Sequence, residues 1–491
     1  MKRNLYKSML GLLLCCVMVS CKKSFLDVVP KGQLVPTTTN DYSLIMNYPA
    51  FYFFTPSGGW QTQVQMGDEV AAEATYFNPA KAISQNAFKW ADVIYQSTDV
   101  DQVMPQWLTD LYSINKVINE VQNSTDGTAQ QKTAVYAEAL ASRAWLYFQF
   151  INFYGKPYVA GTAASDLGFP IIKTADITAT GFTRNSVQEV YDFIISDFNT
   201  AIAGLPLQNP IGPTRFNKAA AEGMLGKVYL YMGKNAEALT LFNAAFTDNA
   251  AESTPARLYN YNVEFATGGK FLPITTSGPT NSPGLNYNDV TESILAKTFD
   301  NGNNLANNFN SNYLVLTPQA AALFSPSDLR LKFYKAQFAN FVVNPSGRLS
   351  KYAVKFSKCG LQISELYLLR AECKTRLNDL AGAEADVETL RNDRMPAASA
   401  TVPAAIAGNQ VALLSFIMDE RTREFAMEGY RFFDMRRLSV DPLFTTPTYT
   451  HILYNDATYT NTTLFTLQPA RFTLKLPPFI MNANPQFTNN Q

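Results

Sequence analysis

The densest set of groups able to do acid–base chemistry lies near the C-terminal end, where ten of the 19 residues from 419 to 437 are charged. Two neighbouring carboxylates could act there as a general acid and a general base. The spacing instead favours ion pairs along helices, because opposite charges three residues apart lie on one helix face. The expected pairs are Glu420 with Arg423, Glu428 with Arg431, and Asp434 with Arg437. We therefore expect structural pairing here and not catalysis, since the stretch supplies no nucleophile, histidine base or metal cluster.

Other titratable residues are equally poor candidates for catalysis. His451 is the only histidine in the chain, and its polar surroundings predict an incidental surface residue. Asp68, Glu69 and Glu73 could contribute to a calcium site, but they lack the ligand spacing of a known calcium loop, so a solvated face is the better interpretation. The sequence predicts no metal, no cofactor and no enzymatic activity.

Aromatic residues in loops offer a different chemistry, which is binding. A sugar ring has apolar C–H faces flanked by hydroxyls, so its site needs flat aromatic rings rimmed by polar side chains. Trp107 and Trp145 lie on apolar helix faces and are predicted to be core. Trp60 and Trp90 lie in loops, where each could be a platform or a buried anchor. The candidate ligand-binding residues are Trp60, Tyr76, Phe77, Asn78 and Trp90, with Asn303, Asn304, Phe309 and Tyr313 as a second wall.

The N-terminal segment predicts export and anchoring. An apolar run from position 9 to 19 follows Lys2, Arg3 and Lys7, which is typical of a signal peptide and too short for a membrane-spanning helix. The sequence MVSC at positions 18–21 resembles the lipobox of bacterial lipoproteins, which implies that residues 1–20 are removed and that Cys21 is lipidated. The alternative is an ordinary secretory signal in which Cys21 occurs by chance.

Charge and cysteine content exclude several classes of protein. After position 20 the chain has 37 Lys and Arg against 40 Asp and Glu, so it lacks the basic footprint that nucleic-acid binding requires. Only Cys359 and Cys373 remain beyond Cys21. We expect Cys373 to lie well inside a helix, too far from Cys359 for a disulfide.

Helical periodicity dominates both sides of a polar middle. Apolar residues recur at steps of three and four from 99 to 121, and a second helical run from 133 ends at Gly155 and Pro157. A third helix is predicted to begin after Ser186, with Glu189 at capping-box spacing, and to end at Gly204. Antiparallel helix pairs are the simplest consequence.

Two further stretches predict tetratricopeptide-like hairpins. They are GKVYLYMGKNAEALTLFNAA, from Gly226, and AECKTRLNDLAGAEADVETL, from Ala371. Both place small residues where two helices would cross, including Ala238 and Ala383, and larger residues in the groove between them. A generic helical bundle is the alternative. The predicted fold is all-α, with the scaffold mainly at 99–247 and 364–438 and a loop-rich binding lobe mainly at 51–98 and 248–360.

Several blocks of sequence resemble the SusD/RagB family of outer-membrane nutrient-binding lipoproteins. They are CKKSFLDVVPKGQ (21–33), RAWLYFQFINFYGKPY (143–158), SELYLLRAECKTRLNDLAGAEADVETLRNDR (364–394), ERTREFAMEGYRFFDMRRL (420–438) and LKLPPFIMNANPQFTNNQ (474–491). The blocks follow the family's order along the chain.

The resemblance implies a tetratricopeptide α-α superhelix, lipid-anchored at the surface of the outer membrane. It also implies a partner, a SusC-like TonB-dependent transporter to which captured oligosaccharide is delivered. An oligopeptide ligand and a surface glycoside hydrolase are the alternatives, although the family's blocks leave no separate domain for a hydrolase.

Overall fold

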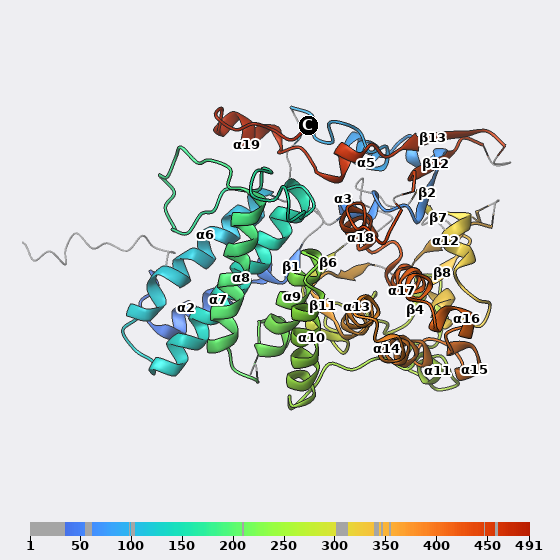
Figure 1. The fold of residues 1–491 in the computed structure, drawn as a ribbon, viewed down its shortest axis with the longest axis horizontal. Helices are drawn as coiled ribbons and strands as arrows, with labels where there is room; N and C mark the ends of the chain where they lie inside the picture. Colours follow the sequence, from blue (N-terminus) through green and yellow to red (C-terminus); the bar gives the residue numbers. More distant parts are fainter. Residues whose placement is uncertain are drawn as a thin grey trace, which may run out of the picture.

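The computed structural model describes residues 35–54, 61–97, 99, 104–208, 211–300, 313–337, 343–344, 347–352, 355–445, 447–456 and 460–491. Helices fill the left, the centre and the lower right of Figure 1, and the largest sheet lies at its upper right. The prediction of a mainly helical fold is therefore confirmed. Among the described residues, no helix combines the length and the apolar character needed to cross a membrane.

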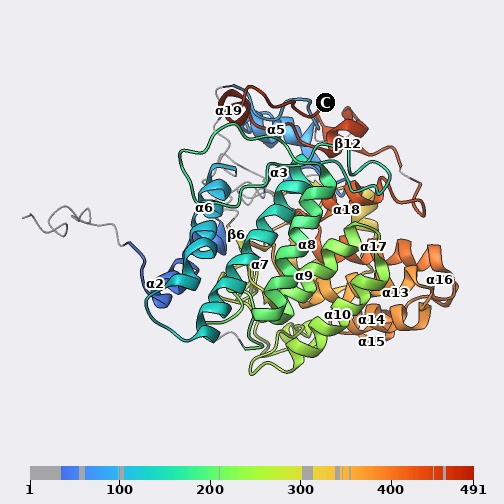
Figure 2. The same ribbon diagram turned by 60° about the vertical axis from the view of Figure 1, so that its left-hand side comes forward.

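The scaffold consists of long helices that follow one another along the chain. They are α6 (Met104–Glu120), α7 (Ala129–Tyr154), α8 (Val187–Gly204), α9 (Lys218–Tyr231), α10 (Asn235–Ala250), α13 (Ile363–Arg376), α14 (Leu380–Asn392), α17 (Gln410–Phe425) and α18 (Arg431–Leu438). In Figure 2, α7, α8, α9 and α10 lie in succession, and α13 and α14 continue the series.

Local sequence sets the ends of these helices. Ser186 caps α8 by accepting the backbone N–H of Glu189, whose side chain accepts the N–H of Ser186 in return, as the spacing predicted. α7 begins with an equivalent capping box between Thr128 and Gln131. It ends at Tyr154, directly before Gly155, so the predicted end is confirmed as well.

The helix hairpins depend on small residues where helices cross. An added Cβ at Gly226 of α9 would lie 2.6 Å from the ring of Phe242 on α10. Ala383 of α14 is fully buried and packs in the cluster that also contains Leu368 and Ala371 of α13. The close approach predicted for both hairpins is therefore present.

Small sheets lie beside the scaffold. A four-stranded sheet has the order β13 (Thr462–Thr466), β12 (Thr450–Tyr454), β2 (Val70–Glu73), β7 (Leu314–Leu316). A three-stranded sheet has the order β1 (Phe53–Phe54), β6 (Thr298–Asp300), β10 (Phe356–Lys358). Two-stranded pairs complete the strands: β3 (Ile274–Thr275) with β4 (Gly278–Pro279), β5 (Ser293–Leu295) with β11 (Leu361–Gln362), and β8 (Tyr334–Lys335) with β9 (Ser350–Lys351).

Short helices occupy the stretches predicted to be irregular and the connections between scaffold helices. They are α2 (Thr39–Ile45), α3 (Gln61–Val64), α4 (Ala74–Phe77), α5 (Ala82–Phe88), α11 (Tyr261–Glu264), α12 (Pro318–Ala322), α15 (Ala397–Ala400), α16 (Ala404–Ala407) and α19 (Pro478–Ala483), with single 3₁₀ turns at Pro49–Phe51, Val121–Asn123, Leu329–Phe333 and Pro469–Phe472. The loop-rich lobe thus contains more regular structure than the sequence indicated.

Residues 419–437, the charged block, form two of the three predicted ion pairs, and these pairs are buried. Glu420 and Arg423 lie 2.6 Å apart within α17, and Asp434 and Arg437 lie 2.9 Å apart within α18. All four side chains are buried. Each carboxylate is matched by guanidinium groups, so the block works as a structural network.

The third predicted pair is wrong. Glu428 pairs with Lys351 at 2.5 Å, and Arg431 pairs with Asp68 at 2.5 Å. The physical reason is that α17 ends at Phe425 and the backbone turns at Met427, where φ is 63°. Residues 428 and 431 therefore do not share a helix face.

The core confirms two further predictions. Trp107 and Trp145 are 2% and 3% exposed, and they pack edge to face at 6.4 Å. Cys359 and Cys373 are both buried free thiols, so no disulfide links them.

Candidate functional site

The two stretches expected to form the walls of a binding site leave the same end of the three-stranded sheet. β1 and β6 are parallel, with Phe54 opposite Phe299, so the chain departs in the same direction after Phe54 and after Asp300. β10 is antiparallel to both and begins at that end, with Phe356 opposite Asp300. Five predicted residues lie outside the described residues, namely Cys21, Trp60, Asn303, Asn304 and Phe309.

After these two stretches the chain is described again from residue 61 and from residue 313. The described chain resumes at Tyr313, whose carbonyl oxygen accepts the backbone N–H of Glu73 at 3.1 Å. The other stretch leads into α3, which packs against α5 and α18. The rings of Phe77 and Tyr313 lie 5.1 Å apart, so described members of the two predicted walls do come together.

The structure corrects the role of three predicted residues. Phe77, Trp90 and Tyr313 are 1%, 4% and 0% exposed, so they present no ring face to a ligand in this structure. The Trp90 indole donates to the carbonyl of Met66 at 3.0 Å, and the Tyr313 hydroxyl donates to the carbonyl of Ser84 at 3.2 Å. Buried aromatic side chains with satisfied polar atoms are core anchors.

His451 is also corrected, from a surface residue to a buried one. Its ring is fully buried and stacks between Trp90, at 3.6 Å, and Phe88, at 4.4 Å. Its ring nitrogens lie 2.6 Å from the carbonyl oxygen of Phe88 and 2.7 Å from that of Gly67. Burial lowers the pKa of His451 to about 4. The hydrogen bonds to the two carbonyl oxygens act in the opposite direction, because they favour the charged ring.

The predicted solvated face at Asp68, Glu69 and Glu73 is wrong for two of its three residues. Glu69 and Glu73 are 3% and 5% exposed. One Glu69 oxygen accepts the N–H of Met427 at 3.2 Å, and burial raises the pKa of Glu69 to about 7. Among the described residues, no group of three His, Cys, Asp or Glu side chains is placed to hold a metal ion.

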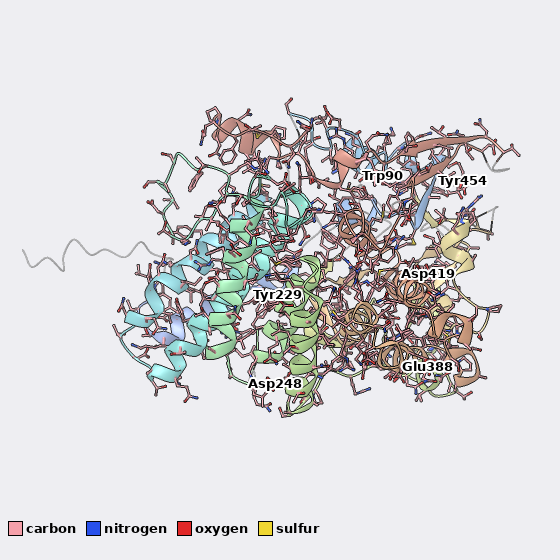
Figure 3. All side chains as sticks on the ribbon, in the orientation of Figure 1. Trp90, Tyr229, Asp248, Glu388, Asp419 and Tyr454 are labelled. Atoms are coloured by element: carbon pink, nitrogen blue, oxygen red, sulfur yellow. The ribbon has the colours of Figure 1, made fainter. Side chains whose placement is uncertain are left out.

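Two predicted residues remain at the surface. Asn78 is exposed directly after α4, and Tyr76 is half-buried against the main core. Tyr454, at the upper right of Figure 3 with Trp90, is buried beneath the guanidinium of Arg348, which lies 3.5 Å from its ring centroid. Among the described residues of the two predicted walls, Asn78 is therefore exposed and Tyr76 half-buried, while the other rings are buried.

An exposed aromatic platform that the sequence analysis missed lies on the three-stranded sheet. Tyr287 is 50% exposed, and its ring lies 5.5 Å from that of Phe53 and 5.8 Å from that of Phe356. The Lys358 ammonium donates to the Tyr287 carbonyl at 2.9 Å and fixes this turn to β10. The signal was weak: a single tyrosine within LNYND, in a stretch interpreted only as polar loop.

A groove adjoins this platform. Its volume is about 840 Å³, within the range of ligand-binding clefts. Asn286 and Asn288, the exposed neighbours of Tyr287, line it together with Arg257, Lys270 and Thr291. Amides, hydroxyls and charged groups beside an exposed ring are the combination that a sugar requires.

The floor of the groove is held by an internal ion pair. Asp289 accepts from the Lys270 ammonium at 2.9 Å and from the Tyr259 hydroxyl at 2.7 Å. Burial would raise the pKa of Asp289, but these hydrogen bonds hold it below its usual value. The carboxylate therefore stays charged and engaged at neutral pH.

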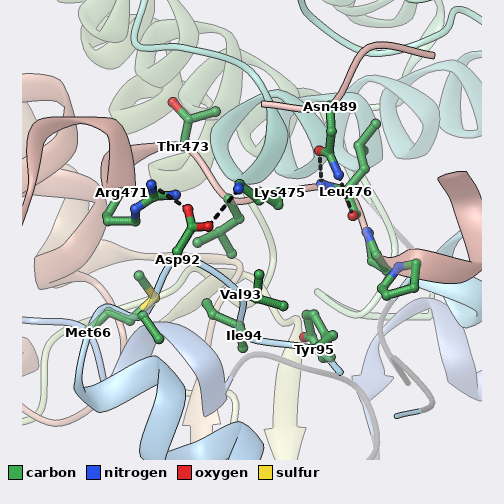
Figure 4. A pocket seen from close by; sticks show the side chains of 14 residues that line it. Met66, Asp92, Val93, Ile94, Tyr95, Arg471, Thr473, Lys475, Leu476 and Asn489 are labelled. Atoms are coloured by element: carbon green, nitrogen blue, oxygen red, sulfur yellow. Dashed lines mark hydrogen bonds and ion pairs between the residues drawn. The ribbon is translucent and has the colours of Figure 1, made fainter. Parts of the chain in front are cut away.

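A smaller cavity of about 190 Å³ lies beneath the C-terminal segment (Figure 4). Asp92 bridges Arg471 and Lys475 across it, with Lys475 at 2.8 Å. The backbone N–H of Leu476 donates to Asn489 at 2.7 Å. These contacts hold the chain end against residues 91–95, so the cavity reflects packing between two segments and lacks an exposed aromatic platform.

Comparisons with known proteins agree with this architecture. A family model described as "Starch-binding associating with outer membrane" matches residues 24–230, and a model described as "SusD family" matches residues 351–478. A SusD-like protein of Bacteroides ovatus is 27% identical over 219 residues, which is 43% of this chain and 36% of that protein. The match thus spans only about a third of the relative's length.

Solved structures show the same fold over nearly the whole chain. A SusD superfamily protein from Bacteroides thetaiotaomicron superposes with a TM-score of 0.66 at 18% identity, covering 92% of this chain and 100% of that one. A SusD-like carbohydrate binding protein from Bacteroides vulgatus superposes with a TM-score of 0.64 at 17% identity, covering 92% and 98%. The two family models together match more than half of the chain, which therefore belongs to the SusD/RagB family.

Proposed function

We propose that this protein binds glycans at the cell surface and delivers them to a TonB-dependent transporter in the outer membrane. Family membership supports glycan binding and an association with the outer membrane, because the N-terminal family model carries both in its description. The lipobox-like MVSC supports an anchor at Cys21 of the mature chain, residues 21–491. The transporter partner follows from the family resemblance.

The observation that carries the proposal is the exposed platform at Tyr287 beside a polar groove. A sugar ring stacked on Tyr287 would place its hydroxyls within reach of Asn286 and Asn288. Phe53 and Phe356 support the tyrosine ring from the side of the sheet, which reduces the entropy lost when a ligand binds. We propose that the predicted residues Trp60, Tyr76, Asn78, Asn303, Asn304 and Phe309 also contribute to glycan binding.

The proposal is for binding without catalysis. Four of the five carboxylates between residues 419 and 437 are held in ion pairs, namely Glu420, Glu424, Glu428 and Asp434. Glu420, for example, lies 2.7 Å from both Arg330 and Arg391. These pairs lower the pKa of Glu420 to about 2, although burial acts in the opposite direction. A carboxylate that stays ionised in such a network is not a proton donor at neutral pH.

The test is affinity electrophoresis through gels containing starch or other neutral and acidic polysaccharides. Tyr287→Ala should reduce retention about 10- to 100-fold in affinity, as expected for a lost stacking contact of about 1 to 3 kcal/mol. Tyr112→Ala is the matched control, because Tyr112 is 38% exposed on scaffold helix α6. Both variants should melt within a few degrees of the parent.

Three outcomes would contradict the proposal. The first is a Tyr287→Ala variant that binds a demonstrated glycan as tightly as the parent. The second is a parent that binds no polysaccharide in the panel but does bind oligopeptides in calorimetry, which would favour the peptide alternative. The third is release of reducing sugar by the purified parent, which would argue for a hydrolase.

A further inference from the structure

β13 is the edge strand of the four-stranded sheet and is built entirely of strand-forming residues. Its sequence, TTLFT, contains no charged residue and no proline. Proteins normally protect an edge strand with such residues, because an uncovered edge pairs with other strands. β13 lies at the upper right margin of Figure 1, with β12 on its inner side.

The register identifies the backbone groups of β13 that face outward. Phe465 is opposite His451 and Thr463 is opposite Leu453. The ladder continues on both sides, since the N–H of Leu467 donates to the Tyr449 carbonyl at 3.0 Å and the N–H of residue 455 donates to the carbonyl of residue 461 at 2.9 Å. Hydrogen-bonded pairs recur at every second residue of an antiparallel ladder. Phe465 and Thr463 therefore bond to β12.

The alternate residues face away from the sheet. Thr462, Leu464 and Thr466 direct their N–H and C=O groups outward, and none of these groups has a partner among the described residues. Their side chains are exposed, and Leu464 is 61% exposed. The strand nevertheless stays in register, because Phe465 packs on the other face against Phe88 at 6.2 Å. β13 is thus a preformed template for one more strand.

We propose that β13 is a docking edge for an extended, uncharged segment of a partner protein, which would pair with Thr462, Leu464 and Thr466 and place an apolar side chain beside Leu464. The backbone pattern requires an extended segment. Because β13 carries no charged residue, it favours an uncharged partner segment. A five-residue strand about 17 Å long buries far less surface than the roughly 1,200 Å² of a stable interface. The partner must therefore also contact this protein elsewhere. For the same reason, β13 alone would not hold two copies of this chain together. This inference does not depend on the proposed glycan site.

The experiment uses the full mature chain and the acetylated, amidated heptapeptide TVTVTVT as the probe, at up to millimolar concentration. Amide hydrogen exchange, resolved to single residues, should slow at least tenfold at Leu464 and Thr466 when the peptide is added. Exchange at Thr463 and Phe465, which already bond to β12, should not change.

Leu464→Pro removes an outward N–H and no ladder bond, so it should abolish the slowing at Thr466 with the melting temperature nearly unchanged. Thr463→Pro is the matched control, since it removes a bond to β12 and should lower the melting temperature. Leu464→Lys keeps the backbone N–H and adds the charge that protects natural edges, so it should weaken peptide binding at least tenfold even if the proline variant misfolds.

Three results would overturn the proposal: no slowing in the parent at millimolar peptide, slowing that persists in Leu464→Lys, or a parent dimer in sedimentation that Leu464→Lys dissociates. The last result would make a second copy of this chain the occupant.

Discussion

Acidification should destabilise the folded protein through His451, the only histidine in the chain. The ring is fully buried between Trp90 and Phe88, and burial lowers its pKa from 6.5 to about 4. An unfolded chain binds a proton at this residue near pH 6.5, whereas the folded chain does so only near pH 4. The stabilising contribution is therefore complete above about pH 6.5 and is lost as the pH falls toward 4.

The magnitude follows from the size of the pKa difference. A fall from 6.5 to about 4 corresponds to about 3 kcal/mol, at about 1.4 kcal/mol per pH unit. Glu69 acts in the opposite direction, because burial raises its pKa to about 7 and so favours folding at lower pH. The contribution of His451 must therefore be isolated as the difference between the parent and His451→Asn, each measured by urea unfolding from pH 4 to 8.

A single histidine makes the direct assay unambiguous. In protein labelled at histidine, the ring signals titrate one group, and the folded protein should show a pKa near 4 against about 6.5 in urea. A neutral ring has one N–H, yet both ring nitrogens face carbonyl oxygens, those of Phe88 and Gly67. A folded-state pKa at or above 6.5 would refute the reasoning, because it would mean that these two acceptors outweigh burial and hold an imidazolium.

Four further substitutions test the anchor, the scaffold and the tryptophans. Cys21→Ser should release the protein in soluble form, and a variant that stays with outer membrane after a high-salt wash would contradict lipidation as the anchor. Ala383→Phe should lower the free energy of unfolding by about 1 to 3 kcal/mol or more, because Ala383 of α14 is fully buried where this helix packs against α13. An unchanged melting temperature would argue against close helix crossing. Trp107→Ala should lose about 3 to 5 kcal/mol of stability, whereas Trp60→Ala should lower glycan affinity about 10- to 100-fold with the melting temperature nearly intact, as calorimetry and titration of both variants would show.

The helical scaffold could be predicted because its determinants are local. The capping box at Ser186 involves residues three apart, and the hairpin at Gly226 depends on a small residue within one turn-connected pair of helices. Apolar periodicity likewise placed Trp107 and Trp145 in the core. Each of these signals depends on residues within about 20 positions of one another, so it can be recognised without knowing the tertiary contacts.

The candidate site was only partly predictable because burial in loop-rich segments depends on distant partners. Trp90 is covered by His451, which lies 361 positions later in the chain, and Phe77 is covered by Tyr313. The local amino-acid composition around these buried rings is the same as that expected around an exposed ring, so it could not predict their burial. Tyr287 was missed for the converse reason: nothing in its neighbourhood marks it as exposed until β1 and β10 place their phenylalanines beside it.

One scaffold element fixes both small sheets relative to each other. In the turn between α17 and α18, the Tyr430 hydroxyl donates to the carbonyl of Lys358 in β10, and the side chain of Lys358 in turn holds the carbonyl of Tyr287. Arg431, at the start of α18, pairs with Asp68 just before β2 of the four-stranded sheet. The aromatic platform and the four-stranded sheet are therefore tied to the same few residues of the scaffold. Because loops carried on a rigid framework keep their spacing, this turn fixes the position of the platform relative to the four-stranded sheet.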